Sequence, residues 1–221
     1  MKKLRLCFCK TGRAKYISHL DMLATIRRAL LRAGVSLEYS EGFNPHPYLS
    51  VALPLSVGCG SMCELMDIGI PDACMPAYPL QLINNALPEG LEVTKAYSPI
   101  RKFSQIAWLG ISGELYYDTG AQQRIADELS ERFSAESIVI AKKTKRGASD
   151  TDIAPFIRET QFRYDGNGQA VYMTAKVSAQ NPTVSPENLI SALDGRHKQL
   201  APDFALFTRT EVFDAEMNVF R

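Results

Sequence analysis

Residues 18–34 have the sequence S-H-L-D-M-L-A-T-I-R-R-A-L-L-R-A-G, and this stretch sets the pattern for the first half of the chain. Ser18, with Asp21 three residues later, is typical of a capped helix start. Gly34 provides a residue that can end the helix in the left-handed region. Apolar residues recur between them at helical spacing: Leu20, Leu23, Ile26, Leu30 and Ala33. The stretch therefore predicts one amphipathic helix.

Segments on both sides of this helix predict strands and a second helix. We expect strands at 4–9 (L-R-L-C-F-C), 35–39, 50–53, 63–70 and 91–97, and a helix at 79–86. The order is that of the split βαβ or ferredoxin-like pattern, strand–helix–strand–strand–helix–strand, with one further strand between the two helices. We assign it to residues 1–98.

The second half of the chain repeats this order. We expect strands at 106–115, 137–142, 153–163, 169–177 and 205–213, and helices at 121–133 and 186–193. A basic turn is expected at 143–149, and the D-G-N-G sequence at 165–168 predicts a hairpin turn. The predicted fold class is therefore α+β, with two tandem ferredoxin-like modules that have antiparallel sheets. The second module covers residues 104–221, and the two join around 98–104.

Residues 40–47 (S-E-G-F-N-P-H-P) are the hardest stretch to explain by folding alone. Pro45 and Pro47 flank His46, which excludes a helix interior or a central strand. Gly42 permits a turn, and Phe43 offers an aromatic face. We expect a stiff loop that presents Asn44 and His46 in a fixed direction, as binding sites require.

Two of the three histidines are candidates for a site. His19 falls at the start of the first helix, where backbone N–H groups attract anions. If the 40–47 loop folds back over that helix start, His19 and His46 share one concavity with Asn44 and Arg28. Two histidines at a phosphate site could act as general base and general acid on RNA. The alternative is structural: His19 caps or packs, and His46 braces its loop.

The charge distribution is uneven although the net charge is only +1. Residues 1–60 hold nine Lys and Arg against three Asp and Glu, whereas residues 61–138 hold five against eleven. A second basic cluster consists of Lys142, Lys143, Lys145 and Arg146. Such clusters attract polyanions even on a neutral protein, although basic residues can also simply solvate a surface.

Several function classes lack support in the sequence. The five cysteines (Cys7, Cys9, Cys59, Cys63 and Cys74) match neither a disulfide framework nor zinc spacing, which favours a reducing cytoplasm and no metal site. No Walker loop, dinucleotide fingerprint, nucleophile elbow or HExxH motif occurs, so we expect no cofactor. No apolar run approaches the length of a membrane span, and we expect no membrane partner.

Five motifs resemble a bacterial radical-SAM-linked family of unknown function. They are Y-I-S-H-L-D at 16–21, Arg27-Arg28 with Ala33-Gly34, the 40–47 loop, residues 152–157, and Arg209-Thr210. Members of that family occur as small free-standing proteins or at the C-terminus of cobalamin-binding radical-SAM proteins. The resemblance implies an accessory to a radical-SAM enzyme. The chain has no C-x₃-C-x₂-C triplet, so radical chemistry would occur on another polypeptide.

We therefore expect a non-catalytic accessory protein that binds a polyanionic substrate, RNA above all, and docks with a radical-SAM protein. The alternatives are a metal-independent endoribonuclease that uses His19 and His46, and a protein-interaction scaffold. Tandem ferredoxin-like domains with a histidine near the first helix also resemble CRISPR repeat-processing nucleases. The predicted substrate-binding residues are Tyr16, Ser18, His19, Asp21, Arg27, Arg28, Phe43, Asn44, His46, Lys142, Lys143, Lys145 and Arg146.

Overall fold

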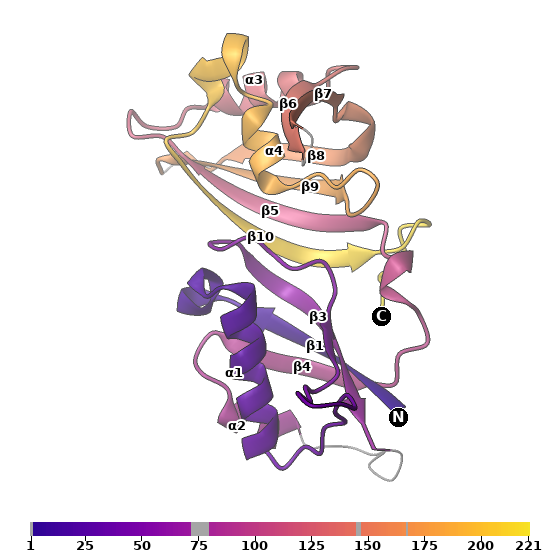
Figure 1. Ribbon diagram of the computed structural model, residues 1–221. Helices are drawn as coiled ribbons and strands as arrows, with labels where there is room; N and C mark the ends of the chain where they lie inside the picture. Colours follow the sequence, from indigo (N-terminus) through magenta and orange to yellow (C-terminus); the bar gives the residue numbers. More distant parts are fainter. Residues whose placement is uncertain (1, 72–79, 145–146, 167) are drawn as a thin grey trace. The chain divides into compact units, whose positions relative to one another are not determined.

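The structure is a computed structural model of the 221-residue chain, and it describes residues 2–71, 80–144, 147–166 and 168–221. The chain divides into two compact units (Figure 1): Met1–Gln105 with Arg221, and Ile106–Phe220. Each unit combines helices with a sheet in which the described strand pairs are antiparallel. The predicted α+β class with antiparallel sheets is therefore confirmed. Cys74, Lys145 and Arg146 lie outside the described residues.

Unit 1 contains four strands and two α-helices in its described part. In chain order they are β1 (Lys2–Lys10), α1 (His19–Arg32), β2 (Leu49–Val51), β3 (Gly60–Ile70), α2 (Leu80–Ala86) and β4 (Leu91–Tyr97), with a 3₁₀-helix, η1 (Gly12–Tyr16), before α1. The strands are ordered β4-β1-β3, and β2 pairs with β3. Figure 1 shows α1 and α2 together on one face of this sheet.

The core of unit 1 lies between α1 and the sheet. Leu4, Leu6 and Phe8 alternate along β1 and are buried on the helix side, where Ile26 and Leu30 of α1 meet them. The helix begins as predicted, because Ser18 Oγ accepts a hydrogen bond from Asp21 N at 3.1 Å. It also ends as predicted, with Gly34 at a φ of +76°.

The strand predicted at 35–39 is wrong. Val35 N still donates to Leu30 O, so the chain is turning off the end of α1, and a single hydrogen bond from Glu38 N to Gly69 O joins this segment to β3 without making it a strand. Val35 and Leu37 are buried in the core as a connection. Only Tyr39 makes a bridge, to Pro47, and the strand that pairs with β3 is β2, on the far side of the 40–47 loop.

Unit 2 contains six strands and two α-helices in its described part. They are β5 (Trp108–Tyr116), α3 (Gln123–Phe133), β6 (Val139–Thr144), β7 (Gly147–Asp152), β8 (Ile157–Tyr164), β9 (Ala170–Ser178), α4 (Pro186–Ser191) and β10 (Phe204–Phe213). The main sheet has the order β10-β5-β9-β8, and β6 with β7 forms a separate hairpin. Besides η1, the described part of the chain contains the 3₁₀-helices η3 (Phe103–Gln105) in unit 1, and η4 (Ala154–Phe156) and η5 (Gly195–Leu200) in unit 2.

Two sequence predictions for unit 2 need correction. The basic stretch is part of the β6–β7 hairpin, in which Lys142 pairs with Ser149, so it is not a plain turn over 143–149. The strand expected from residue 153 begins at Ile157, because η4 with Pro155 intervenes. None of the helices in the described part of the chain combines the length and the apolar character that a membrane crossing requires.

Candidate functional site

The 40–47 loop is closed on itself by hydrogen bonds between Ser40 and His46. Ser40 N donates to His46 O at 2.9 Å, and His46 N donates to Ser40 Oγ at 3.1 Å. The bridge between Tyr39 and Pro47 continues this closure, and Gly42 takes a φ of +118° at the bend. These contacts hold the loop as the stiff element that its prolines predict.

The imidazole of His46 is oriented by the same closure. Its Nδ1 lies 3.0 Å from Ser40 Oγ and 3.4 Å from Asn44 O. His46 is exposed. Because Nδ1 is engaged by the loop, Nε2 is the ring nitrogen available to a ligand, either as a hydrogen-bond partner or, when the ring is protonated, as a positive charge.

The tip of the loop carries a solvent-exposed aromatic ring. Phe43 has a relative exposure of 112%, and the neighbouring Asn44 is also exposed. Tyr39 and Tyr48 flank the loop and remain 40% and 43% exposed. Scattered apolar residues are normal on a surface, but three exposed aromatic rings within ten residues make this loop a candidate binding surface.

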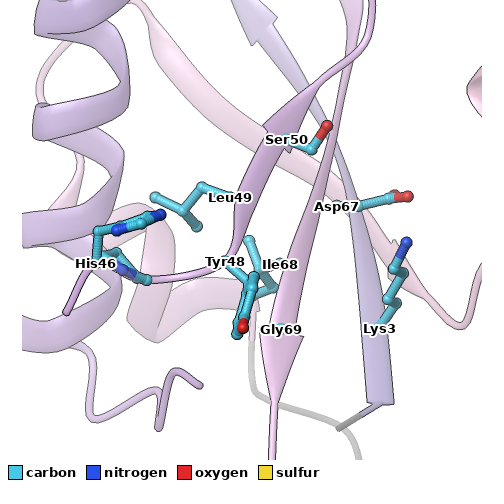
Figure 2. Close-up of a pocket in the computed structure, with 9 residues that line it drawn as sticks. Lys3, His46, Tyr48, Leu49, Ser50, Asp67, Ile68 and Gly69 are labelled. Atoms are coloured by element: carbon cyan, nitrogen blue, oxygen red, sulfur yellow. The ribbon is translucent and has the colours of Figure 1, made fainter. Parts of the chain in front are cut away.

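A pocket of about 240 Å³ lies beside the loop, at the edge of the unit 1 sheet (Figure 2). Its lining comes from the start of β1, from β2 and the residues before it, and from the end of β3: Lys3, His46, Pro47, Tyr48, Leu49, Ser50, Asp67, Ile68 and Gly69. Figure 2 shows Lys3 and Asp67 on one side of β3, with His46 and Leu49 on the other. The sequence analysis singled out only His46 from this set.

The negative charge of the pocket is neutralised within the fold. Arg5 Nε and Nη2 donate to the two carboxylate oxygens of Asp67 at 2.6 and 2.9 Å. The Arg5 side chain is buried, and its guanidinium lies 4.2 Å from the centroid of the Phe103 ring. Lys3 is therefore the charged lining residue outside this ion pair, and its ammonium group suits an anionic ligand.

The start of α1 carries a different set of predicted residues. Ser18 and Asp21 bond to each other, with Ser18 Oγ donating to Asp21 Oδ2 at 2.7 Å, so both cap the helix. His19 is half-buried, and its Nδ1 is buried without a hydrogen-bond partner in the structure. Tyr16 is exposed, with Lys15 Nζ 5.2 Å from its ring centroid. At the end of β1, burial lowers the pKa of the Lys10 side chain.

The structure does not bring His19 and His46 into one concavity, and that expectation is wrong. Near His19, Gly58 N donates to Lys15 O just before β3, whereas near His46, Glu38 N donates to Gly69 O at the other end of β3. The strand is 11 residues long, which places its two ends on the order of 30 Å apart. The loop turns away from the helix start because the chain runs the length of α1 before it reaches Ser40.

The remaining predicted residues do not line this pocket. Arg27 and Arg28 lie midway along α1, the first half-buried and the second exposed. Lys142 belongs to unit 2, and its Nζ donates to Thr183 O at 2.5 Å. Lys143 is placed in β6, but its side chain, like all of Lys145 and Arg146, falls outside what the structure describes.

Sequence reasoning missed Lys3, Tyr48, Ser50 and Asp67 as neighbours of His46. Lys3 and Asp67 come from adjacent strands and meet only through the β1–β3 register, in which Lys3 pairs with Gly69. Within the described part of the chain, no three His, Cys, Asp or Glu side chains gather in a way that could hold a metal ion.

Comparison with solved structures gives distant likenesses. A CRISPR-associated protein from Thermus thermophilus is 16% identical, with 94% of this chain and 99% of that chain covered and a TM-score of 0.21. Thermus thermophilus Cse3 bound to an RNA representing a pre-cleavage complex is 16% identical, with 93% and 98% covered and a TM-score of 0.20. At such scores these likenesses carry no argument about function.

The family is established by the sequence itself. No curated protein matches the chain. A family model does match, over residues 3–186, which include both the 40–47 loop and the pocket beside it. The chain therefore belongs to the family described as "Uncharacterized protein conserved in bacteria (DUF2344)".

Proposed function

We propose that this protein binds RNA through the 40–47 loop of unit 1 and the pocket beside it, as a non-catalytic accessory protein. The observation that carries the proposal is the fully exposed Phe43 next to Asn44 on a loop closed by hydrogen bonds. RNA is read mainly through unstacked bases, which stack on aromatic side chains and bond to amides at their edges. Phe43 supplies the ring, and Asn44 supplies both donors and an acceptor.

The distribution of charge between the units favours an anionic ligand on unit 1. Residues 2–105 hold 12 Lys and Arg against eight Asp and Glu, a net +4, whereas residues 106–220 hold 12 against 16, a net −4. Lys2 and Lys3 are exposed at the start of β1, close to the pocket. Phosphate contacts from these lysines would release counterions, so binding should weaken as salt rises.

The nuclease alternative loses its geometric basis. A general acid and a general base must both reach one phosphodiester, within about 3 Å of the reacting atoms. His19 and His46 lie near opposite ends of β3, so they cannot serve one phosphate together. Binding without cleavage is therefore the function that we propose.

The partner that we propose is a radical-SAM protein. The resemblance of residues 16–21 and 40–47 to the radical-SAM-linked family supports this assignment. The chain itself contains no cluster-binding cysteine triplet, so it would present RNA or another substrate to an enzyme on a second polypeptide. The cysteines in the described part of the chain, Cys7, Cys9, Cys59 and Cys63, form no disulfide with one another, which favours a cytoplasmic location.

We also propose that the chain consists of two ferredoxin-like modules, at 1–98 and 104–221. In each unit the first and third strands of the βαββαβ order would occupy the centre of the sheet. The strand order β4-β1-β3-β2 in unit 1 and β10-β5-β9-β8 in unit 2 supports this assignment. The β6–β7 hairpin would then be an insertion after the first helix of the second module.

The test compares Phe43→Ala with Ile100→Ala by fluorescence anisotropy on a labelled mixed-sequence single-stranded RNA at low salt. Both residues are exposed apolar side chains of unit 1, so the pair separates stacking from surface apolarity. Loss of one stacked base should weaken binding by about 5- to 150-fold for Phe43→Ala and leave Ile100→Ala unchanged. Equal affinities of the two variants, or no binding by the parent protein, would refute the proposal.

A further inference from the structure

The sheet of unit 2 has one face that α3 and α4 do not cover. Phe133 of α3 stacks on Phe162 of β8 with ring centroids 5.3 Å apart, and Arg132 of α3 donates to Ala192 O at the end of α4. Both helices therefore lie on the side to which Phe162 points. Residues that alternate with Phe162 and its partner Met173 point to the opposite side, which we call the open sheet face.

Two arginines on the open sheet face are stacked on aromatic rings. The guanidinium carbon of Arg158 lies 4.1 Å from the centroid of the Trp108 ring, and that of Arg163 lies 5.5 Å from the centroid of Tyr172. Both arginines are exposed. Cation–π attraction holds each guanidinium over its ring, and because both arginines are exposed, a flat ligand can reach them.

Polar side chains lie between the two stacked arginines. Arg158 pairs with Lys176 and Arg163 with Tyr172, so four residues of β9, roughly 14 Å, separate them. The pair between them, Gln161 and Thr174, is exposed on the same face. An amide and a hydroxyl therefore stand between two cationic stacking planes and can bond to base edges.

Charge on the open sheet face is polarised across the strands. Lys176 Nζ forms an ion pair with Glu159 at 2.7 Å, so it contributes little net charge. Glu114 and Glu211 lie on β5 and β10, and Glu114 accepts a hydrogen bond from Tyr116. Among the described residues of this face, the positive charge outside that ion pair is carried by Arg158 and Arg163 along β8. This edge is therefore complementary to a single polyanionic strand.

We propose that the open sheet face is a binding site for single-stranded nucleic acid that runs along β8 and β9. Bases would stack on the Arg158 and Arg163 planes, their edges would bond to Gln161 and Thr174, and the two guanidinium charges would attract phosphates. An acidic peptide would also be attracted by the two guanidinium charges, but its carboxylate side chains have no flat rings that could stack on Arg158 and Arg163. The inference goes beyond the proposed function, because the site lies in the other unit and does not depend on Phe43.

The test uses Trp108, which is the only tryptophan of the chain and lies under Arg158. Intrinsic fluorescence is titrated with a 12-nucleotide single-stranded RNA, with DNA of the same sequence, and with polyglutamate, in a Phe43→Ala background. We expect the RNA to change the Trp108 emission. The DNA should do the same unless the site contacts the 2′-hydroxyl, in which case only the RNA changes the emission. Arg158→Ala and Arg163→Ala should each weaken binding by about 5-fold or more.

Arg196→Ala is the matched control, since it removes an exposed arginine of unit 2 that lies on η5 and not on the sheet. It should bind as the Phe43→Ala parent does. The proposal fails if nucleic acid leaves the Trp108 emission unchanged, if polyglutamate produces the same change, or if Arg158→Ala and Arg163→Ala bind as well as Arg196→Ala. If the protein with Phe43 intact bound the RNA no more tightly than the Phe43→Ala variant, while Arg158→Ala and Arg163→Ala still weakened binding, the proposed function alone would be refuted.

Discussion

Single residues in the unit 1 site have separable tasks. Phe43 and Asn44 face solvent, whereas Ser40 holds the imidazole of His46 and Arg5 holds the carboxylate of Asp67. Ser18 and Asp21, predicted as site residues, cap α1. The groups that would touch RNA are therefore distinct from the groups that position them.

The Arg5–Asp67 pair gives a prediction about stability. Asp67→Ala leaves the buried Arg5 guanidinium without its carboxylate, which should lower the free energy of unfolding by about 3–5 kcal/mol. Urea unfolding followed by circular dichroism measures the change. The control, Glu92→Ala, removes an exposed carboxylate from neighbouring β4 and should stay within about 0.5 kcal/mol. A similar small effect for Asp67→Ala would contradict the role of the pair.

At the scale of elements, signals between neighbouring residues predicted where helices and strands begin and end, whereas contacts between residues far apart in the sequence could not be predicted. Ser18 and Gly34 bound α1, and the strand expected at Leu91–Tyr97 is β4 with the same ends. The strand expected at 35–39 failed because apolar alternation there reflects core packing of a connection. The pocket and the open sheet face could not be predicted, because Lys3 meets Asp67 and Arg158 meets Trp108 only through strand pairing.

The base of the β6–β7 hairpin gives a prediction about pH. Asp152 Oδ1 accepts hydrogen bonds from Ile138 N at 2.8 Å and Ala154 N at 3.0 Å, and these backbone donors, with Ser137, lower the pKa of Asp152. A carboxyl whose pKa is lower in the folded state stabilises the fold above its unfolded pKa. That contribution is lost as the pH falls through the folded pKa, below about pH 4.

Asp152→Asn keeps an acceptor but cannot titrate, so its melting temperature should fall less than that of the parent protein between pH 5 and pH 2.5. Thermal melts at both pH values measure this difference. Asp150→Asn, at an exposed position of the same hairpin, should follow the parent. If Asp152→Asn also followed the parent at every pH, the assigned hydrogen bonds would not stabilise the hairpin.

At the scale of the whole molecule, the chain carries opposite net charges on its two units. Unit 1 holds the excess of positive charge, and unit 2 holds an excess of negative charge that is interrupted along β8 by Arg158 and Arg163. The small net charge of the whole protein therefore conceals two local surfaces that can attract polyanions. Because the charge is divided between the units, the net charge of the whole chain does not distinguish an RNA-binding protein from a protein-interaction scaffold.

The most direct test of the central claim is photo-crosslinking of the full-length protein to a single-stranded RNA that contains 4-thiouridine, with the crosslinked residues mapped by mass spectrometry. We expect crosslinks within residues 39–48, at or next to Phe43, and we expect these crosslinks to disappear as the salt concentration rises. Crosslinks confined to unit 2, or none at all under conditions in which the RNA is bound, would contradict the central claim.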